Sequence, residues 1–138
     1  MLNRSDYERL LYALADRYPE VTVSTLRLYD NSANSSLVRG SIYFDNGLEA
    51  RVFEYIDWAS GELLHYSYTI FRGAEKIRWY DPQPHPGNPA LAATFPHHYH
   101  TAPDIKHHRL PATGISFDTP NLPTLISDCI DSGKTLTP

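Results

Sequence analysis

Residues 36–57 read SLVRGSIYFDNGLEARVFEYID, in which two runs rich in β-branched and aromatic residues flank an Asn-Gly pair at 46–47. Asn-Gly between two such runs is the strongest short-range signal for a β-hairpin. A two-residue turn at this pair fixes the register and places Arg39 opposite Glu54. The stretch therefore predicts an antiparallel sheet and a first set of cross-strand neighbours.

Runs of the same kind lie on both sides of the hairpin, and together they predict five strands at residues 21–29, 36–44, 48–57, 63–72 and 75–80. A capping-box spacing at Ser5 and apolar residues at helical intervals predict an N-terminal helix that Pro19 ends. A second helix is expected near the C-terminus, with Pro123 near its start and Gly133 past its end. The fold class is thus α+β, a five-stranded antiparallel meander with both helices packed on one face.

Two-residue turns at 60–61 and 73–74 extend the register to the remaining strands. One face then collects mostly apolar side chains and is predicted to be the core face: Val38, Ile42, Phe44, Arg51, Phe53, Tyr55, Tyr66, Tyr68, Ile70, Ile77 and Trp79. The opposite face collects polar and ionisable side chains: Arg39, Glu54, His65, Ser67, Thr69, Arg78 and Tyr80.

Composition and length define the broad class of the protein. The chain has 138 residues, of which 41% are hydrophobic, so we expect one folded domain over 1–138. A single cysteine, Cys129, excludes an internal disulfide framework. The start of the chain is polar and charged, and no apolar stretch approaches the length of a membrane span, so a cytoplasmic protein without membrane contact is expected. A net charge of -4 argues against a surface that coats nucleic acid broadly.

Residues 81–111 read DPQPHPGNPALAATFPHHYHTAPDIKHHRLP and hold six of the seven histidines and seven of the eleven prolines. Proline stiffens the backbone, and histidine titrates near neutral pH or binds metal ions. Long loops without secondary structure are uncommon in compact domains unless they are functional or disordered. We therefore expect a functional His/Pro-rich loop that presents these side chains.

Within this loop, an extended backbone over 96–100 puts His98 and His100 on one side and His97 on the other. The pair can ligate a metal, or one histidine can act on a substrate while another orients it. A metal site needs further ligands, for which His85, Asp81, His107 and His108 are the candidates. The alternatives are that the histidines only hydrogen-bond the loop to the sheet, and that His107 and His108 form a solvated edge.

Asp81 precedes a proline, so its carboxylate either starts a turn or orients a neighbouring imidazole. Arg39 and Glu54 form either an ordinary cross-strand ion pair or part of an anion-binding cleft. The cleft would also contain His65, Arg78 and Tyr80.

Two strings in this region, YDPQPH at 80–85 and TFPHHYH at 94–100, resemble the signature of the TumE-like family of prokaryotic toxin–antitoxin toxins, which has the form YDN-x-PH followed by TFPHHKH. The strand-rich first half is similar as well, with Glu54 and the Tyr-x-Tyr pair at 66–68. The chain departs from the signature at Pro82, in an enlarged segment over 86–93, and at Tyr99, where a lysine is frequent.

The resemblance implies a toxin-like protein that pairs with an antitoxin, and toxins of this size are most often ribonucleases. Metal-independent RNA cleavage needs a general base, a general acid and cationic groups around the phosphate. We assign the acid, base and orienting roles to His97, His98, His100 and His85, with Asp81 beside them. The expected substrate-binding residues are Arg39, Glu54, His65, Arg78 and Tyr80.

No cofactor is expected under this hypothesis, and the sequence leaves a homodimer open. One alternative is a metal-dependent hydrolase or nuclease in which His85, His98 and His100 bind a divalent transition metal. The other is a non-catalytic domain that uses the proline-rich loop to bind a partner.

Overall fold

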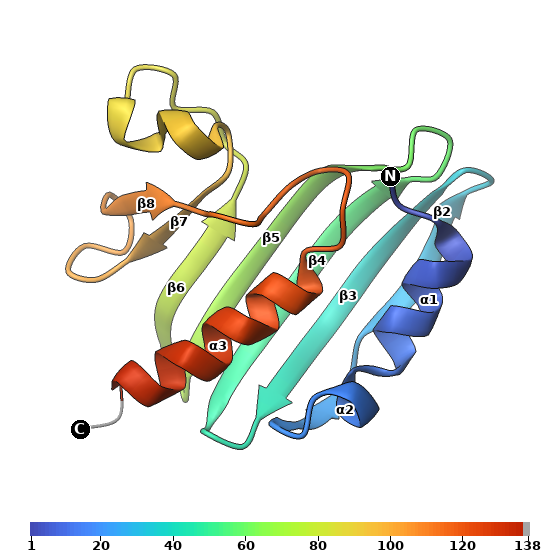
Figure 1. Ribbon diagram of the computed structural model, residues 1–138, viewed down its shortest axis with the longest axis horizontal. Helices are drawn as coiled ribbons and strands as arrows, with labels where there is room; N and C mark the ends of the chain where they lie inside the picture. The colour runs from blue at the N-terminus through green and yellow to red at the C-terminus, as the bar shows by residue number, and fades with distance from the viewer. Residues whose placement is uncertain (137–138) are drawn as a thin grey trace.

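The structure is a computed structural model that describes the backbone of residues 1–136 and the side chains of residues 1–131 (Figure 1). Its helical elements are α1 (Arg4–Tyr12), α2 (Leu14–Arg17), the short 3-10 helix η1 (Pro89–Thr94) and α3 (Leu122–Leu136). Its strands are β1 (Val21–Ser24), β2 (Arg27–Ser32), β3 (Ser35–Phe44), β4 (Leu48–Asp57), β5 (Glu62–Arg72), β6 (Glu75–Asp81), β7 (His98–Thr101) and β8 (Arg109–Pro111).

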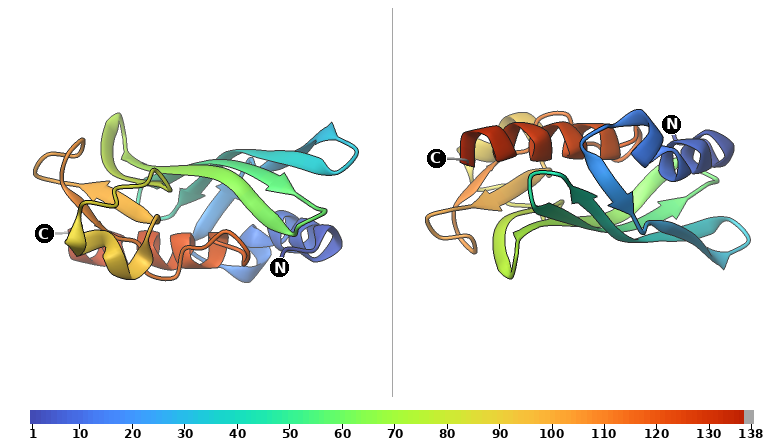
Figure 2. Two further views of the ribbon diagram at one scale, coloured as in Figure 1. Left: turned by 90° about the horizontal axis from the view of Figure 1, so that it is seen from above. Right: turned by 90° about the horizontal axis from the view of Figure 1, so that it is seen from below.

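Within the described residues, the strands form one antiparallel eight-stranded sheet in the order β1-β3-β4-β5-β6-β7-β8, with β2 also paired to β3. From β3 to β8 each strand pairs with the next along the chain, as in the expected meander. Helices α1, α2 and α3 all lie on one side of this sheet (Figure 2). We call the covered side the helix face and the opposite side the open face.

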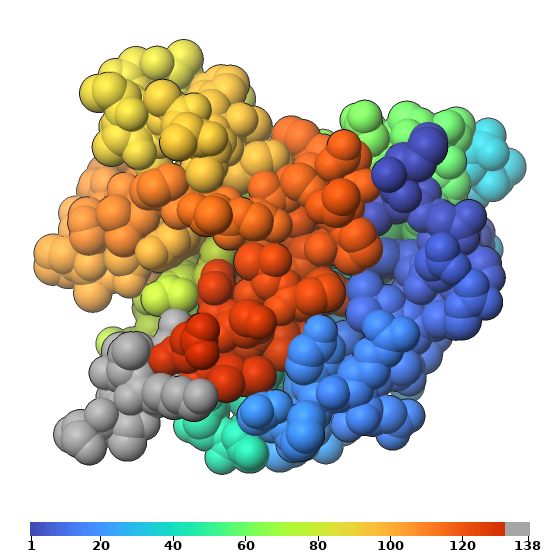
Figure 3. Space-filling view, viewed as in Figure 1, coloured from blue at the N-terminus to red at the C-terminus, as the bar shows by residue number. Residues whose placement is uncertain are grey.

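The core lies between the helices and the helix face. Helix α1 contributes Tyr7, Leu10 and Leu11, and α3 contributes Leu125, Ile126 and Cys129, all buried and three or four residues apart along one side of each helix. In the space-filling view the red-orange α3 and the blue α1 and α2 cover the middle of the sheet (Figure 3). None of the helices in residues 1–136 has the length and apolar character needed to cross a membrane.

The sheet has more strands than the five expected. The predicted strand 21–29 is two strands, β1 and β2, because the strand is interrupted at Thr25, where the backbone passes close to Gly40 of β3. The long loop is also partly structured, since it contains η1, β7 and β8. Residues 98–101 become a strand because they pair with β6, a long-range contact that local sequence does not reveal.

The predicted faces are correct for β3 and β5 but wrong for β4. Residues 45–47 form a three-residue turn with Gly47 at φ 86°, so Val38 rather than Arg39 lies opposite Glu54. The next connection, 58–61, is two residues longer than predicted, which leaves the alternation unchanged, but a β-bulge at Leu64, between the pairs Tyr55–His65 and Ile56–Leu63, restores the predicted faces of β5. As a result Val52, Glu54 and Ile56 face the helices, whereas Arg51, Phe53 and Tyr55 lie on the open face.

The predicted faces are also wrong for β6, for a different reason. The two-residue turn at 73–74 is present, because Arg72 pairs with Glu75. A β-bulge between Lys76 and Arg78 then shifts the register by one residue. Beyond the bulge, Arg78 and Tyr80 point to the helix face, and Trp79 points to the open face.

The helix boundaries differ from those expected. The N-cap of α1 is Asn3, whose side-chain oxygen accepts a hydrogen bond from the backbone N–H of Asp6, so Ser5 lies inside the helix rather than capping it. Helix α3 continues through Gly133 to Leu136, so this glycine does not lie past the helix end.

Candidate functional site

Strands β6 and β7 bring Asp81, His98 and His100 together on one side of the sheet. Asp81 pairs with His98 across the two strands, and Trp79 pairs with His100. The two histidine Nε2 atoms are 3.2 Å apart, and they lie 3.3 Å (His98) and 3.0 Å (His100) from the carboxylate oxygens of Asp81. This Asp81–His98–His100 cluster is the one group of at least three possible metal ligands found in the described residues.

Backbone groups fix the orientation of all three side chains. Nδ1 of His98 lies 3.1 Å from the carbonyl oxygen of Pro96, and Nδ1 of His100 lies 3.2 Å from that of Lys106. A carbonyl oxygen only accepts, so each Nδ1 donates and each Nε2 faces the carboxylate. Oδ1 of Asp81 also accepts a 2.8 Å hydrogen bond from the backbone N–H of Gln83, so this aspartate both starts a turn and holds the imidazoles.

The cluster is buried, although the sequence predicted an exposed loop. Asp81, His98 and His100 retain 5%, 1% and 3% of their exposure. Trp79 stacks on His100 with ring centroids 4.4 Å apart, and His85 packs edge-on against His98 at 5.0 Å. Burial lowers the pKa of His98 below that of a free histidine.

His85 lies next to the cluster with one unsatisfied nitrogen. Its Nε2 is buried and has no hydrogen-bond partner among the described residues. Burial and the nearby charge of Arg109 lower the pKa of His85. The ring is therefore held close to His98 without any contact that uses its Nε2.

His97 does not join the other predicted catalytic residues. As the alternation of an extended chain predicts, it points away from His98 and His100. Its Nδ1 lies 2.6 Å from the hydroxyl of Tyr66, and its ring packs against Phe117 with centroids 4.5 Å apart. Burial lowers the pKa of His97 too, so this residue is a neutral part of the packing between loop and sheet.

His107 and His108 lie apart from the cluster. Both are exposed, and Nδ1 of His107 is 2.9 Å from a carboxylate oxygen of Asp104. The solvated edge expected for this pair is confirmed, and neither residue completes the cluster.

The predicted substrate-binding residues are divided between the two faces. Arg39 and His65 lie exposed on the open face, and both side chains contact the ring of Phe53. Glu54 was wrongly placed there, because its side chain is fully buried and accepts hydrogen bonds from the hydroxyls of Tyr7 and Tyr68.

Arg78 and Tyr80 were also wrongly placed, because the bulge in β6 turns them to the helix face. The Tyr80 hydroxyl donates a 2.7 Å hydrogen bond to Asp128 of α3 and accepts one of 3.3 Å from Arg78. The Arg78 guanidinium lies over the ring of Tyr99, 4.8 Å from its centroid. These residues attach the middle of α3 to the sheet.

The open face carries functional candidates that the register error concealed. On this face Arg51 lies over the ring of Phe71 at 4.3 Å, and Lys76 lies over Trp79 at 5.3 Å. One row of cross-strand pairs runs from these residues to the cluster: Ser41, Arg51, Thr69, Trp79, His100 and Arg109. A three-residue turn at Asp-Asn-Gly, 45–47, would have predicted the observed register and placed Arg51 on the open face.

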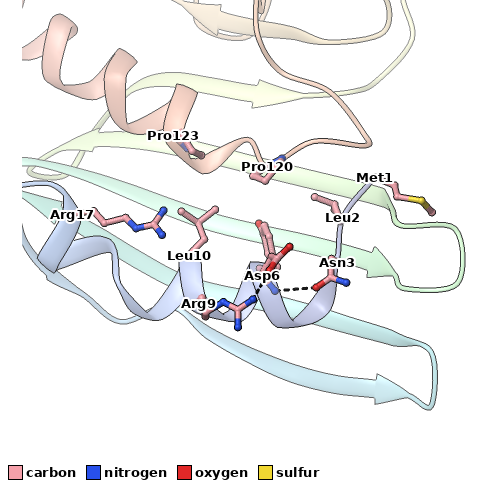
Figure 4. Close-up of a pocket in the computed structure, with 10 residues that line it drawn as sticks. Met1, Leu2, Asn3, Asp6, Arg9, Leu10, Arg17, Pro120 and Pro123 are labelled. Atoms are coloured by element: carbon pink, nitrogen blue, oxygen red, sulfur yellow. Dashed lines mark hydrogen bonds and ion pairs between the residues drawn. The ribbon is translucent and has the colours of Figure 1, made fainter.

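Two hollows lie apart from the cluster. One, of about 520 Å³, lies between α1 and the segment before α3, and Asn3, Arg9, Arg17 and Pro120 are among its lining residues (Figure 4). The second, of about 300 Å³, lies between the β5–β6 turn and the loop after β7. Neither is lined by Asp81, His98 or His100.

Chemically, two imidazoles and one carboxylate can hold a cation or share protons. Trp79 links the cluster to the middle of the open face. Its ring stacks on His100, and its Nε1 donates a 3.2 Å hydrogen bond to Ser67 of β5.

Comparison with known proteins agrees with the signature around the cluster. Residues 10–132 match the model of a protein family described as Toxin TumE. Neither the curated proteins nor the solved structures contain a match to the chain. Because the family match extends over nearly the whole sequence and includes Asp81, His98 and His100, the chain belongs to the TumE toxin family.

Proposed function

We propose that this chain is the toxin of a toxin–antitoxin pair and acts as an endoribonuclease that binds single-stranded RNA across the open face. Family membership supports the toxin role and an antitoxin partner. The observation that carries the RNA assignment is the set of cation–aromatic pairs on the sheet face opposite α1, α2 and α3. Single-stranded nucleic acids bind to surfaces of this kind, where bases stack on aromatic rings and cations hold the phosphates.

The charges of the open face support an anionic ligand. Arg27 and Arg39 lie directly opposite each other on β2 and β3, a like-charge pair that destabilises a sheet unless an anion neutralises it. In residues 1–131 neither arginine has an acidic ion-pair partner, whereas Arg51 has Glu49 at 3.3 Å. Arg27, Arg39, Arg51 and Lys76 thus share one face of a chain whose net charge is -4.

Cleavage is assigned to the cluster at the end of this face. The row of pairs from Arg51 through Trp79 leads to His100, so an RNA strand on the open face would pass beside the cluster. Both nitrogens of His98 and of His100 have neighbours within hydrogen-bond distance, and both rings are buried. This geometry supports the metal-dependent alternative better than direct proton transfer from four free histidines.

The test is expression of the wild type in a host that lacks the antitoxin, compared with Asp81→Asn. The substitution removes the carboxylate charge with little change in shape, so we expect growth arrest and RNA degradation with the wild type and a loss of both in the variant. Asp104→Asn is the matched control, because Asp104 is exposed and pairs with His107 outside the cluster. The control should stay toxic.

Purified protein identifies the substrate and the reaction class. We expect it to cut labelled single-stranded RNA and to leave DNA of the same sequence intact. Activity that persists in chelator would restore the metal-independent mechanism. Growth arrest with intact RNA at high protein concentration would overturn the endoribonuclease and point to a toxin with another target.

A further inference from the structure

We infer that Asp81, His98 and His100 bind a divalent transition-metal ion of the zinc type, and that the ring of His85, which lies just outside this group, moves in to supply the fourth ligand. The separations of 3.2, 3.3 and 3.0 Å among the imidazole nitrogens and carboxylate oxygens carry this inference. Ligand atoms about 2.0–2.1 Å from one tetrahedral zinc ion lie about 3.3–3.4 Å apart. The two imidazole nitrogens have nearly this spacing, and each faces its own oxygen of Asp81, Oδ1 beside His98 and Oδ2 beside His100, so the carboxylate is placed to ligate an ion held between the rings.

The hydrogen bonds around the cluster also favour a positive charge at its centre. Each histidine donates from Nδ1 to a backbone carbonyl, so a neutral ring directs a lone pair from Nε2 toward the other ring and toward Asp81. Two lone pairs and a carboxylate at this distance repel one another unless a positive charge lies between them. Histidines that ligate metals characteristically donate the other ring N–H to a carbonyl in this way.

Burial makes the need for a cation stronger. An ionised carboxylate without a partner is strongly unfavourable inside a protein. Among the side chains of residues 1–131, Asp81 forms ion pairs only with the two histidines, and no lysine or arginine forms an ion pair with it. A bound ion or a shared proton can supply the missing charge, and these two occupants give different experimental results.

His85 provides the second, independent observation. Its Nε2 is buried without a hydrogen-bond partner among the described residues, and its ring lies 5.0 Å from that of His98. A buried nitrogen left without a partner is unfavourable, and ligation of an ion would satisfy it. Three nitrogens and one oxygen suit zinc and its neighbours, whereas magnesium prefers oxygen ligands.

The primary test measures metal binding and does not depend on RNA cleavage. Full-length protein is stripped with chelator, dialysed and titrated with Zn²⁺ by calorimetry, with Mg²⁺ as the comparison ion. We expect about one Zn²⁺ per chain and a Tm that rises with Zn²⁺ concentration, because an ion that binds only the folded state stabilises it. Mg²⁺ should produce neither effect.

Variants locate the site. His98→Ala and His100→Ala should abolish binding, and His85→Ala should weaken it at least tenfold. His107→Ala, a histidine exposed outside the cluster, should bind as the wild type does. Circular dichroism checks that each variant folds. The visible spectrum of the wild type loaded with Co²⁺ reports whether the ligands are tetrahedral nitrogens and oxygens, and this readout does not depend on any variant.

Two results would overturn the inference. If the stripped wild type takes up no Zn²⁺ or Co²⁺ and its Tm is unchanged, the cluster is held by a shared proton. If folded His98→Ala or His100→Ala binds as the wild type does, or His107→Ala alone loses the ion, the site lies elsewhere. Either outcome is separate from the endoribonuclease proposal, which is tested by the fate of RNA.

Discussion

Glu54 is a buried carboxylate in the middle of the sheet, held by hydroxyl groups instead of a cation. Tyr7 and Tyr68 each donate a hydrogen bond to one of its oxygens, and Asn121 donates a 3.0 Å hydrogen bond to the Tyr68 hydroxyl. These bonds connect α1, β4, β5 and the start of α3. Burial raises the pKa of Glu54, and the two tyrosine hydrogen bonds only partly oppose this effect.

The raised pKa gives a prediction for Glu54→Gln. The folded state holds the Glu54 proton more tightly than the unfolded state, in which the pKa of a glutamate is about 4.3. The contribution of Glu54 to stability is therefore full below that pH and is lost as the pH rises through the pKa of the folded state. We therefore expect Glu54→Gln to be as stable as the wild type or more stable at neutral pH. The difference should shrink on acidification, as measured by urea unfolding at several pH values.

Glu75→Gln is the control for this comparison, because Glu75 is exposed at a turn. It should follow the wild type at every pH. A wild type that gains stability relative to Glu54→Gln as pH rises would mean that the hydroxyl donors outweigh burial.

Single side chains also show how far the sequence could locate the site. Alternation along residues 96–100 correctly placed His98 and His100 together and His97 apart, because period-two geometry is local. The position of Asp81 beside them depends on pairing between β6 and β7, whose paired residues are 17 or more positions apart. Histidine-rich composition alone could not reveal that the loop forms a strand and buries its imidazoles.

At the scale of elements, small local departures determined which face each strand presents. The turn at 45–47 has one residue more than the Asn-Gly signal predicts, and the bulge in β6 adds another shift. Each exchanges the buried and open sides of a whole strand. The meander and the helix-covered face could be predicted from hydrophobic pattern, but Glu54, Arg78 and Tyr80 could not be placed correctly, because their faces depend on single-residue insertions.

Gly40 is a further element-scale determinant, because it allows the chain to pass from β1 to β2 across β3. Its φ is 137°, and a Cβ at this position would lie 2.6 Å from the carbonyl oxygen of Thr25. We expect Gly40→Ala to destabilise the protein by roughly 3 kcal/mol or more, from backbone strain and overpacking together. Denaturant unfolding measures the change.

Gly73→Ala separates the two contributions to the Gly40 effect. Gly73 also has a positive φ, 59°, but a Cβ there meets no atom within 4 Å. This variant should lose only about 1 kcal/mol, from backbone strain. Equal losses in the two variants would mean that the crossing at Thr25 can move aside.

For the whole molecule, the two faces of the sheet have different roles. The helix face is closed by α1, α2 and α3, and the hydrogen bonds of Glu54 and Tyr80 connect these helices to the sheet. The open face has exposed cations over aromatic rings and extends to Trp79 and the cluster. Stability and proposed RNA binding are therefore carried by opposite sides of one sheet, so they can be changed separately.

That separation is tested by matched charge removal on the two sides. The combined variant Arg27→Gln, Arg39→Gln and Arg51→Gln should bind single-stranded RNA at least tenfold more weakly than the wild type. Each lost phosphate contact should reduce the slope of log affinity against log salt by about 0.7. Fluorescence anisotropy with a labelled RNA, at several salt concentrations, measures both effects.

The control removes the same number of charges elsewhere, with Arg9→Gln and Arg17→Gln in α1 and α2 and Arg72→Gln on the helix side of β5, all of them exposed. Because both variants have the same net charge, a general effect of charge would weaken RNA binding equally in the two. We expect the control to keep both the affinity and the salt slope of the wild type, because phosphates respond to nearby cations within about 10 Å at moderate salt. A control that loses as much affinity as the open-face variant would show that RNA binds elsewhere, and the row from Arg51 to His100 would then be part of the sheet without being a path to the cluster.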